Sequence, residues 1–250
     1  ETGQAELVKP ALELIQVGRA RMQLTPAELP SYLGGSGPLD KLAREFLDLL
    51  LHGDRASASQ VILGAVREGA PVRDIYIQVF QRTQREIGRL WQTNQISVAQ
   101  EHFCTAATQM VMSQLYPFIF TGERKPRKVV VTCVGGELHE IGARMVADFF
   151  EMEGWDSYFL GANTPPEAVI STINEKQADI LAVSATMTYH IHKVRELIQA
   201  LRASPAEHTR VLVGGYPFNI AGSLWKQVGA DGYAGDAQGA IQMADKVLAA

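Results

Sequence analysis

Cysteine is scarce in this sequence. Its 250 residues include two, Cys104 and Cys133, which fall in a helical and a strand-like segment respectively. Neither belongs to a CxxC pair or to any other spacing that ligates zinc in proteins. The cysteines therefore give no support for a zinc site, and two reduced thiols favour a cytoplasmic protein.

Long apolar runs and basic patches are also missing. No apolar run approaches the ~18 residues of a membrane span, and the polar, acidic N-terminus lacks a signal-peptide pattern. The net charge is −4, and the longest basic run is the short cluster 124–128, which argues against a nucleic-acid surface. With 46% hydrophobic residues, the chain can form one large domain or two modest ones.

The first half of the chain has helical periodicity. Residues 1–38 predict an accessory helix followed by a linker rich in proline and glycine. Further helices follow over 39–122, with stops at Gly53 and Gly69 and a capping-box pattern that starts at Ser97. Because the connections are short, neighbouring helices should be antiparallel, so we expect a helical bundle over 39–122.

After residue 126 the periodicity changes to alternating strands and helices. Strand-like runs occupy 128–133, 157–160, 179–184, 210–213 and 231–234, and helical runs occupy 141–153, 166–176, 190–203, 217–228 and 237–249. This alternation predicts a Rossmann-like (flavodoxin-like) five-stranded parallel sheet of order 2-1-3-4-5 over 126–250. The expected fold is thus a helical bundle followed by an α/β domain.

The loop after the first strand contains a histidine that opens a helix. Four β-branched residues from Val129 predict a buried strand, and Gly135-Gly136 ends it. His139 therefore lies at the carboxyl end of a strand, where open α/β sheets bind ligands. A neutral imidazole is the commonest metal ligand, and Glu137 and Glu140 could hold its second ring nitrogen. The alternative is a loop histidine that merely bonds to a carboxylate.

Two familiar α/β sites do not match these loops. A receiver domain needs an aspartate at the end of the third strand, where this chain has Ser-Ala-Thr-Met-Thr over 184–188. A dinucleotide site needs GxGxxG after the first strand, whereas Gly135-Gly136 is followed here by the carboxylate of Glu137, which repels phosphate. A nucleotide ligand is therefore not expected.

Three loops at the predicted carboxyl edge of the sheet carry a spaced motif: Glu137-x-His139-x-x-Gly142, Ser184-x-Thr186 and Gly214-Gly215. This motif resembles the cobalamin-binding Rossmann-like family, whose pattern is DxHxxG, then SxL or SxT, then GG, and the resemblance spans 126–250. It implies that His139 coordinates cobalt from below after displacing the dimethylbenzimidazole base. It also implies a set of further cofactor contacts: Glu137, Leu138, Glu140, Ile141, Gly142, Ser184, Thr186, Gly214, Gly215 and Gly235.

Small residues at the strand ends fit this interpretation. Ser184 and Gly214-Gly215 would leave a slot for the nucleotide tail of the cofactor, and the hydroxyls of Ser184 and Thr186 could bond to it. Taken singly, each of these residues is also compatible with ordinary turn chemistry or a plain strand end.

The helical segment carries a second resemblance. Trp91, nine further residues and then Glu101-His102 resemble the Wx9EH signature of CarH- and LitR-type light-sensing cobalamin proteins. The resemblance implies that Trp91 packs over a 5′-deoxyadenosyl group in a pocket shared with Val98, Glu101 and His102. The alternative is that Trp91 is a core residue and that Glu101-His102 caps a helix.

Two departures limit this second resemblance. Gln92 stands where CarH-type repressors have a histidine, and residues 1–38 are too few and too acidic for a MerR-type DNA-binding module. No direct nucleic-acid binding is therefore expected. What is left resembles photocobilins, which add a linear tetrapyrrole such as biliverdin. Candidate bilin contacts, which are otherwise surface residues at helix starts, are Tyr189, His190, His192 and Tyr216.

The main hypothesis from the sequence is a non-enzymatic photoreceptor. It would bind adenosylcobalamin base-off on His139, and light would cleave the Co–C bond and change the conformation or oligomeric state. We expect chromophores as small-molecule partners, no membrane, a homo-oligomer and an unknown downstream effector. The alternative is a corrinoid methyl carrier of a methyltransferase system, against which Glu137 in place of aspartate and the Wx9EH signature argue. A radical mutase fits less well because the chain lacks a large substrate barrel, and a passive cobalamin-storing module is a third class.

Overall fold

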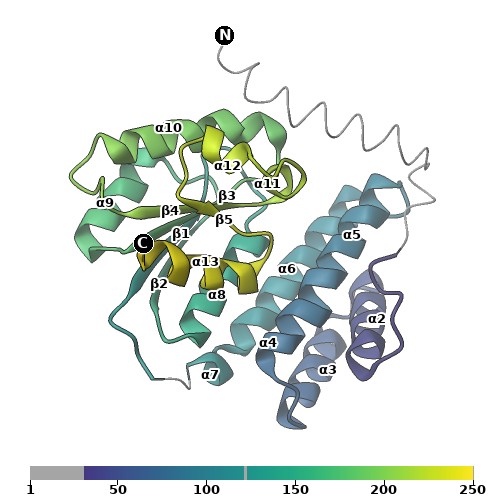
Figure 1. The fold of residues 1–250 in the computed structure, drawn as a ribbon. Helices are drawn as coiled ribbons and strands as arrows, with labels where there is room; N and C mark the ends of the chain where they lie inside the picture. Colours follow the sequence, from purple (N-terminus) through teal and green to yellow (C-terminus); the bar gives the residue numbers. More distant parts are fainter. Residues whose placement is uncertain (1–30, 121–122, 250) are drawn as a thin grey trace. The chain divides into compact units, whose positions relative to one another are not determined.

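The computed structural model describes residues 31–120 and 123–249, which divide into two compact units, one helical and one α/β (Figure 1). The accessory helix expected within 1–38 falls largely outside the described residues. Within these two ranges, no helix combines the length and the apolar character needed to cross a membrane.

The helical unit consists of α2 Pro38–Leu51, α3 Arg55–Arg67, α4 Val72–Asp74, a π-helical stretch Ile75–Gln81, α5 Arg82–Gln92, α6 Val98–Gln114 and α7 Tyr116–Ile119. Gly53 and Gly69 follow α2 and α3 with φ of +77° and +100°, a conformation that glycine adopts without strain. The predicted capping box is confirmed, because the Ser97 hydroxyl accepts a bond from the Gln100 N–H at 3.2 Å and the Gln100 side chain accepts one from the Ser97 N–H at 3.0 Å.

Aromatic rings fill the core of the helical unit. Phe80 packs against Phe46 and Tyr76, with ring centroids 5.5 Å and 5.3 Å apart. Tyr76 and Phe80 lie in the π-helical stretch, where Ile75 and Val79 are buried as well. A π turn closes i→i+5 hydrogen bonds in place of i→i+4 bonds, and two adjacent pairs of residues are buried in this stretch. The sequence pattern predicted a regular helix over this stretch.

The α/β unit contains strands β1 Lys128–Cys133, β2 Asp156–Gly161, β3 Ile180–Ser184, β4 Arg210–Gly214 and β5 Gly232–Tyr233. Its helices are α8 Ile141–Met152, α9 Pro166–Lys176, α10 Ile191–Arg202, α11 Tyr216–Ile220, α12 Leu224–Gln227 and α13 Ala237–Leu248. All paired strands are parallel and the order is β2-β1-β3-β4-β5, which confirms the predicted fold class and strand order. In Figure 1, α8 and α13 lie on one face of the sheet, and α9, α10 and α12 lie on the other.

Burial on both faces explains the composition of the strands. Val130, Leu181 and Val211 belong to the cluster beneath α9 and α10, and Val129 and Val131, which point to the opposite face, are buried too. A strand covered on both sides needs a continuous apolar run in place of an alternating one.

One predicted helix is divided in two. The sequence predicted a helix over 217–228, but α11 ends at Ile220 and α12 begins at Leu224. Ala221 lies between them with φ −116° and ψ 77°, outside the helical region. Gly222 and Ser223 follow, and both residue types are unfavourable in a helix interior, which favours a break at this point.

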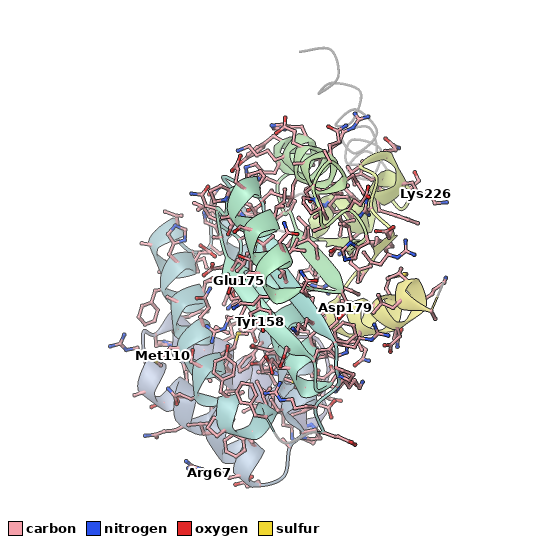
Figure 2. All side chains as sticks on the ribbon, turned by 90° about the vertical axis from the view of Figure 1, so that its left-hand side faces the viewer. Arg67, Met110, Tyr158, Glu175, Asp179 and Lys226 are labelled. Atoms are coloured by element: carbon pink, nitrogen blue, oxygen red, sulfur yellow. The ribbon has the colours of Figure 1, made fainter. Side chains whose placement is uncertain are left out.

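At the amino edge of the sheet, polar side chains bond to residues at the starts of neighbouring strands. Asp179 accepts hydrogen bonds from the backbone N–H of Lys128 at 2.8 Å and from Arg127 at 3.0 Å. On the edge strand β2, the Tyr158 ring lies 5.4 Å from the ammonium of Lys176, and Figure 2 shows Tyr158 on the same side of the unit as Asp179. These contacts occupy the amino edge, opposite the edge where the sequence predicts a ligand.

Candidate functional site

Three strands end side by side at the carboxyl edge of the sheet. Cys133 of β1 pairs with Ser184 of β3, and Ser184 pairs with Gly214 of β4. The loops that carry the three parts of the predicted motif therefore begin next to one another, at the carboxyl ends of β1, β3 and β4. The fold brings together residues that are far apart in the sequence.

Glu137 is a buried carboxylate that joins two of these loops. Its side chain has no exposed surface. Its Oε1 atom lies 2.5 Å from Nδ1 of His139 and accepts a bond from the backbone N–H of that residue at 3.1 Å. Its Oε2 atom accepts bonds from the backbone N–H groups of Thr186 at 2.8 Å and Met187 at 3.1 Å, and lies 3.0 Å from Nδ1 of His190. Five donors thus compensate the burial of one charge.

These donors keep Glu137 ionised. Burial alone would raise the pKa of Glu137, but hydrogen bonds from His139, His190 and the backbone outweigh it and hold the pKa well below its usual range. An ionised carboxylate only accepts, so each histidine presents Nδ1–H to it. Nε2 is then the nitrogen of His139 that can coordinate a metal, on a side chain that is 54% exposed.

Cys133 and Glu140 hold the same loop from other sides. The Cys133 thiol lies 3.6 Å from the carbonyl oxygen of His139, and burial, together with the charges of Glu137 and Glu140, raises its pKa to about 12. Glu140 accepts a hydrogen bond from the backbone N–H of Ala162 at 2.9 Å, just beyond β2. Of the two carboxylates expected to orient the histidine, Glu137 bonds to its Nδ1.

Glycines at this edge are required by close packing between loops. Gly215 has φ +105°, and a Cβ atom there would lie 2.1 Å from the carbonyl oxygen of Ala185. A Cβ atom at Gly214 would lie 3.1 Å from the carbonyl oxygen of Ala234. The sequence predicted that these glycines leave a slot for a ligand, and the structure adds a second reason for them in the contact between backbones.

The four candidate bilin contacts differ in exposure. Tyr189 and Tyr216 are exposed, and His192 is half-buried in the first turn of α10. His190 is 5% exposed and bonded to Glu137, so it is not a surface residue at a helix start. Its ring also packs edge-on against Tyr189, with centroids 4.4 Å apart.

Sequence reasoning missed three contributors to this edge. His190 was noted, but not as a partner of Glu137. Lys193 donates to the carbonyl oxygen of Gly135 at 2.7 Å, and the side chain of Asn163 accepts a bond from the N–H of Gly136 at 2.7 Å. All three residues follow strands that end at this edge. Their position after β2 or β3 could have indicated that they lie near the site, but it does not show which residue each of them contacts.

The candidate residues of the helical unit lie around the start of α6. Trp91 and Val98 are 44% and 50% exposed, so Trp91 is not a core residue. His102 Nδ1 lies 2.5 Å from a carboxylate oxygen of Glu101, and the other oxygen accepts a bond from the Thr105 hydroxyl at 3.0 Å. Gln92, at the end of α5, is exposed.

Three further predicted contacts belong to the α/β unit. Gly142 is exposed, Ile141 is half-buried, and the carbonyl oxygen of Gly235 accepts a bond from Asn219 at 3.3 Å. The roles of all these residues toward a cofactor stay predictions.

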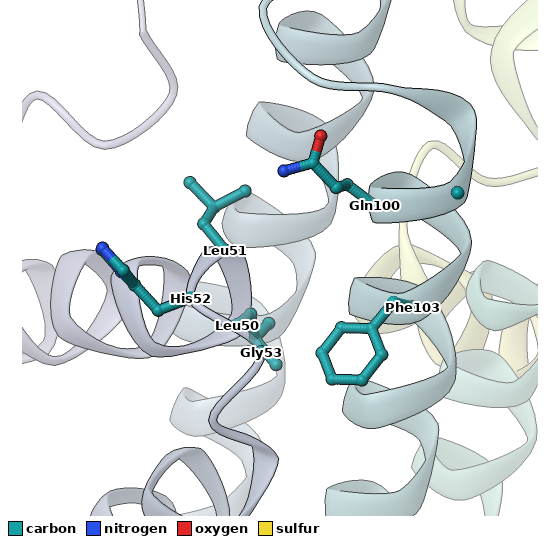
Figure 3. A pocket seen from close by; sticks show the side chains of 7 residues that line it. Leu50, Leu51, His52, Gly53, Gln100 and Phe103 are labelled. Atoms are coloured by element: carbon teal, nitrogen blue, oxygen red, sulfur yellow. The ribbon is translucent and has the colours of Figure 1, made fainter.

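The helical unit also has a cavity of about 310 Å³ between the end of α2 and the start of α6 (Figure 3). Leu50, Gly53 and Phe103 are among its lining residues. None of the predicted cofactor contacts lines it, so it is not the predicted site.

Comparisons with known proteins identify the family. Two family models, both described as a B12 binding domain, match residues 127–242 and 42–116. Dimethylamine corrinoid protein 3 of Methanosarcina mazei is 30% identical over 123 residues, which cover 48% of this chain and 72% of that protein. The chain belongs to the B12-binding corrinoid protein family. It therefore binds a corrinoid.

Two further comparisons extend over both units. A corrinoid protein of Desulfitobacterium hafniense is 28% identical over 217 residues, covering 84% of this chain and 97% of that protein. Among solved structures, the monomethylamine corrinoid protein of Methanosarcina barkeri aligns with a TM-score of 0.73 at 20% identity, covering 83% of this chain and 98% of that chain. The structural match supports the fold.

These findings overturn two expectations. The photoreceptor hypothesis is wrong, because relatives matched over almost their whole length are named corrinoid proteins, one of them for dimethylamine. The hypothesis rested on a few positions in the helical unit, and similarity over 84% of the chain outweighs them. The expected partners, chromophores with an unknown effector, are wrong for the same reason. The findings favour the alternative, a corrinoid methyl carrier.

The carboxyl edge of the sheet fits a corrinoid. His139 offers an oriented imidazole on a side chain that is 54% exposed. The exposed apolar surfaces of Leu138, Tyr189 and Tyr216, which are 73%, 56% and 55% exposed, suit a large macrocycle. Within the described ranges, no three metal-ligating side chains gather into a cluster. A metal held by His139 would thus take its other ligands from elsewhere, as cobalt does from the four ring nitrogens of a corrin.

Proposed function

We propose that this chain is the methyl carrier of a corrinoid-dependent methyltransferase system. The observation that carries the proposal is the pairing of His139 with the buried Glu137 in a chain whose relatives, matched over both units, include dimethylamine corrinoid proteins. When bound, a corrinoid supplies a cobalt atom that can accept a methyl group and pass it on. The partners we propose are methyltransferases that hold the methyl donor and the methyl acceptor.

In this proposal His139 is the lower ligand of the cobalt. Glu137 fixes the tautomer of the imidazole, so that Nδ1 carries the proton and Nε2 faces the metal. A carboxylate on the far nitrogen also makes the imidazole a stronger base and limits its rotation. The burial of Glu137 strengthens both effects, because water cannot compete for its oxygens.

The remaining predicted residues are proposed as cofactor contacts. Ser184 and Gly214-Gly215 would leave room for the nucleotide tail at the strand ends, and the hydroxyls of Ser184 and Thr186 would bond to it. Gly235 is a further proposed contact. In the helical unit we retain Trp91, Val98, Glu101 and His102 as proposed contacts. The upper ligand we propose is a methyl group in place of the predicted adenosyl group, and biliverdin has no part in the proposal.

The first experiment tests the lower ligand. The protein is reconstituted with methylcobalamin in darkness, separated from free ligand and analysed by absorbance spectroscopy. We expect a base-off spectrum with histidine coordination for the wild type and loss of that coordination in His139→Ala. The matched control is His192→Ala, which changes a nearby, half-buried histidine on the first turn of α10 and should behave as the wild type. Equal spectra for all three proteins would contradict the assignment of His139.

The second experiment tests methyl transfer. The reduced, cobalamin-loaded protein is incubated with deuterium-labelled dimethylamine and a dimethylamine:corrinoid methyltransferase, and the corrinoid is then extracted for mass spectrometry. We expect labelled methyl on the corrinoid from the wild type and at least tenfold less from His139→Ala. A loaded wild type that takes no label from dimethylamine, monomethylamine or methanol with their methyltransferases would contradict the carrier function.

A further inference from the structure

A second histidine contacts the carboxylate that orients His139. His190 ends the 3₁₀ turn Thr188–His190 directly before α10, and it is 5% exposed. Its Nδ1 atom lies 3.0 Å from Oε2 of Glu137. Burying an imidazole is unfavourable unless its polar atoms find partners, so this contact accounts for the burial of His190.

The two oxygens of Glu137 serve different loops. Oε1 receives both bonds from His139, and Oε2 receives the bonds from the loop after β3. Rotation of the carboxylate would break both sets, so the donors on Oε2 determine where Oε1 points. Oε2 has three donors. Two are the backbone N–H groups of Thr186 and Met187, and the third, the imidazole of His190, is a side chain and can be changed by substitution.

The surrounding residues are fitted to His190. Gly136 has φ +82°, and a Cβ atom there would lie 3.3 Å from Nε2 of His190 and 2.9 Å from Nζ of Lys193. Lys193 is on the first turn of α10 and donates to the carbonyl oxygen of Gly135 at 2.7 Å. The loop after β1 and the start of α10 therefore meet closely at this point, with glycine leaving space for the ring.

We propose that His190 is a positioning residue for the lower cobalt ligand. It holds Oε2 of Glu137, so that Oε1 keeps the Nδ1 proton of His139 in place and Nε2 faces the corrinoid. The inference deepens the proposed function, since it rests on His139 as the ligand. Glu137 has one methylene more than the aspartate of the DxHxxG pattern, and its two oxygens bond to His139 and His190 from this backbone position.

The test uses electron paramagnetic resonance of the protein loaded with cobalamin in the Co(II) state. A coordinating nitrogen splits the cobalt lines, and protein made with ¹⁵N-histidine changes that splitting only if a protein histidine coordinates. In His190→Leu we expect the ratio of histidine-coordinated to uncoordinated cobalt to fall about 10- to 100-fold, the usual effect of losing an outer partner of a metal ligand. In His190→Asn the amide nitrogen occupies the place of Nδ1, and we expect a ratio within a few-fold of the wild type.

The control is His192→Leu, which removes a neighbouring half-buried imidazole of α10 and should leave the ratio unchanged. Thermal unfolding of each apoprotein shows whether a variant is folded. If His190→Leu does not fold, His190→Gln replaces it. The amide nitrogen of that glutamine reaches the place of the histidine Nε2 and not that of Nδ1, so it cannot bond to Glu137 as His190 does. Equal ratios for the wild type and the Leu or Gln variant would overturn the role of His190 alone. No ¹⁵N effect in the wild type would overturn the assignment of His139, and the role of His190 with it.

Discussion

The carbonyl oxygen of Ala185 lies where a side chain of Gly215 would begin: a Cβ atom at Gly215 would be 2.1 Å from it. Gly215 also has φ +105°, which strains any other residue. The backbones that follow β3 and β4 thus approach each other closely at Gly215, where any larger residue would clash. We expect Gly215→Ala to lower the free energy of unfolding by about 2–4 kcal/mol, since it combines backbone strain with a clash.

Urea unfolding of the apoprotein measures this effect. Gly222→Ala is the matched control, because a Cβ atom there meets no other atom within 4 Å. It should change the stability by no more than about 0.5 kcal/mol. A Gly215→Ala protein as stable as Gly222→Ala would show that the two loops can separate without cost.

The length of the Glu137 side chain should matter for stability. Glu137→Asp can keep a bond to His139, but it withdraws the acceptor from Thr186, Met187 and His190. Buried donors left without an acceptor cost about 1–3 kcal/mol each, so we expect a loss of at least about 2 kcal/mol in urea unfolding. Glu153→Asp, a change on a partly exposed side chain, is the control. Equal stability of the two variants would mean that the loop after β3 follows the shorter side chain.

Local patterns were sufficient to predict the fold. The β-branched run from Val129 and the stop at Gly135-Gly136 define β1 within a few residues. The capping box at Ser97 likewise marks the start of α6. The break between α11 and α12 was missed because Gly222 and Ser223 lower helix propensity only modestly, and tertiary packing decides such cases. The π-helical stretch was missed because its apolar spacing also fits an α-helix.

The candidate site was predictable only in part. The spacing of Glu137 and His139 is local, so their contact could be anticipated. The contact between Glu137 and His190 spans 53 positions and depends on the strand register of β1 and β3, which no local pattern contains. The function was misjudged because Trp91 and Glu101-His102 form a short signature, whereas the family matches cover most of both units, over residues 42–116 and 127–242.

Both thiols should be unreactive in the native protein. Burial and the nearby Glu101 raise the pKa of Cys104 to about 11, and burial with Glu137 and Glu140 raises that of Cys133 to about 12. Because the thiolate is the reactive form, neither cysteine should be alkylated by iodoacetamide within an hour at pH 8, and both should react in urea. Mass spectrometry of the intact protein reads out the labelling. Fast native labelling of Cys133 would show that the loop carrying His139 opens readily.

The ion pair of Glu86 and Arg89 should stabilise the helical unit. Glu86 is 4% exposed, lies 2.6 Å from Arg89 and accepts a bond from the backbone N–H of Tyr32 at 2.9 Å. Arg89→Met leaves the carboxylate buried without its cation, which should cost about 3–5 kcal/mol at pH 7. The double variant Glu86→Gln/Arg89→Met removes the charge as well and should recover part of this loss.

The pH dependence of that loss has a defined sign. Burial would raise the pKa of Glu86, but the bonds from Arg89 and Tyr32 outweigh it and lower the pKa in the native protein. The stabilisation is therefore complete above the unfolded pKa of about 4.3 and is lost as the pH falls through the native pKa. In Arg89→Met burial acts without Arg89 and raises the pKa, so protonation relieves that variant. The difference in unfolding free energy between the wild type and Arg89→Met should shrink from pH 7 to pH 4, and a constant difference would show that the loss comes from packing and not from charge.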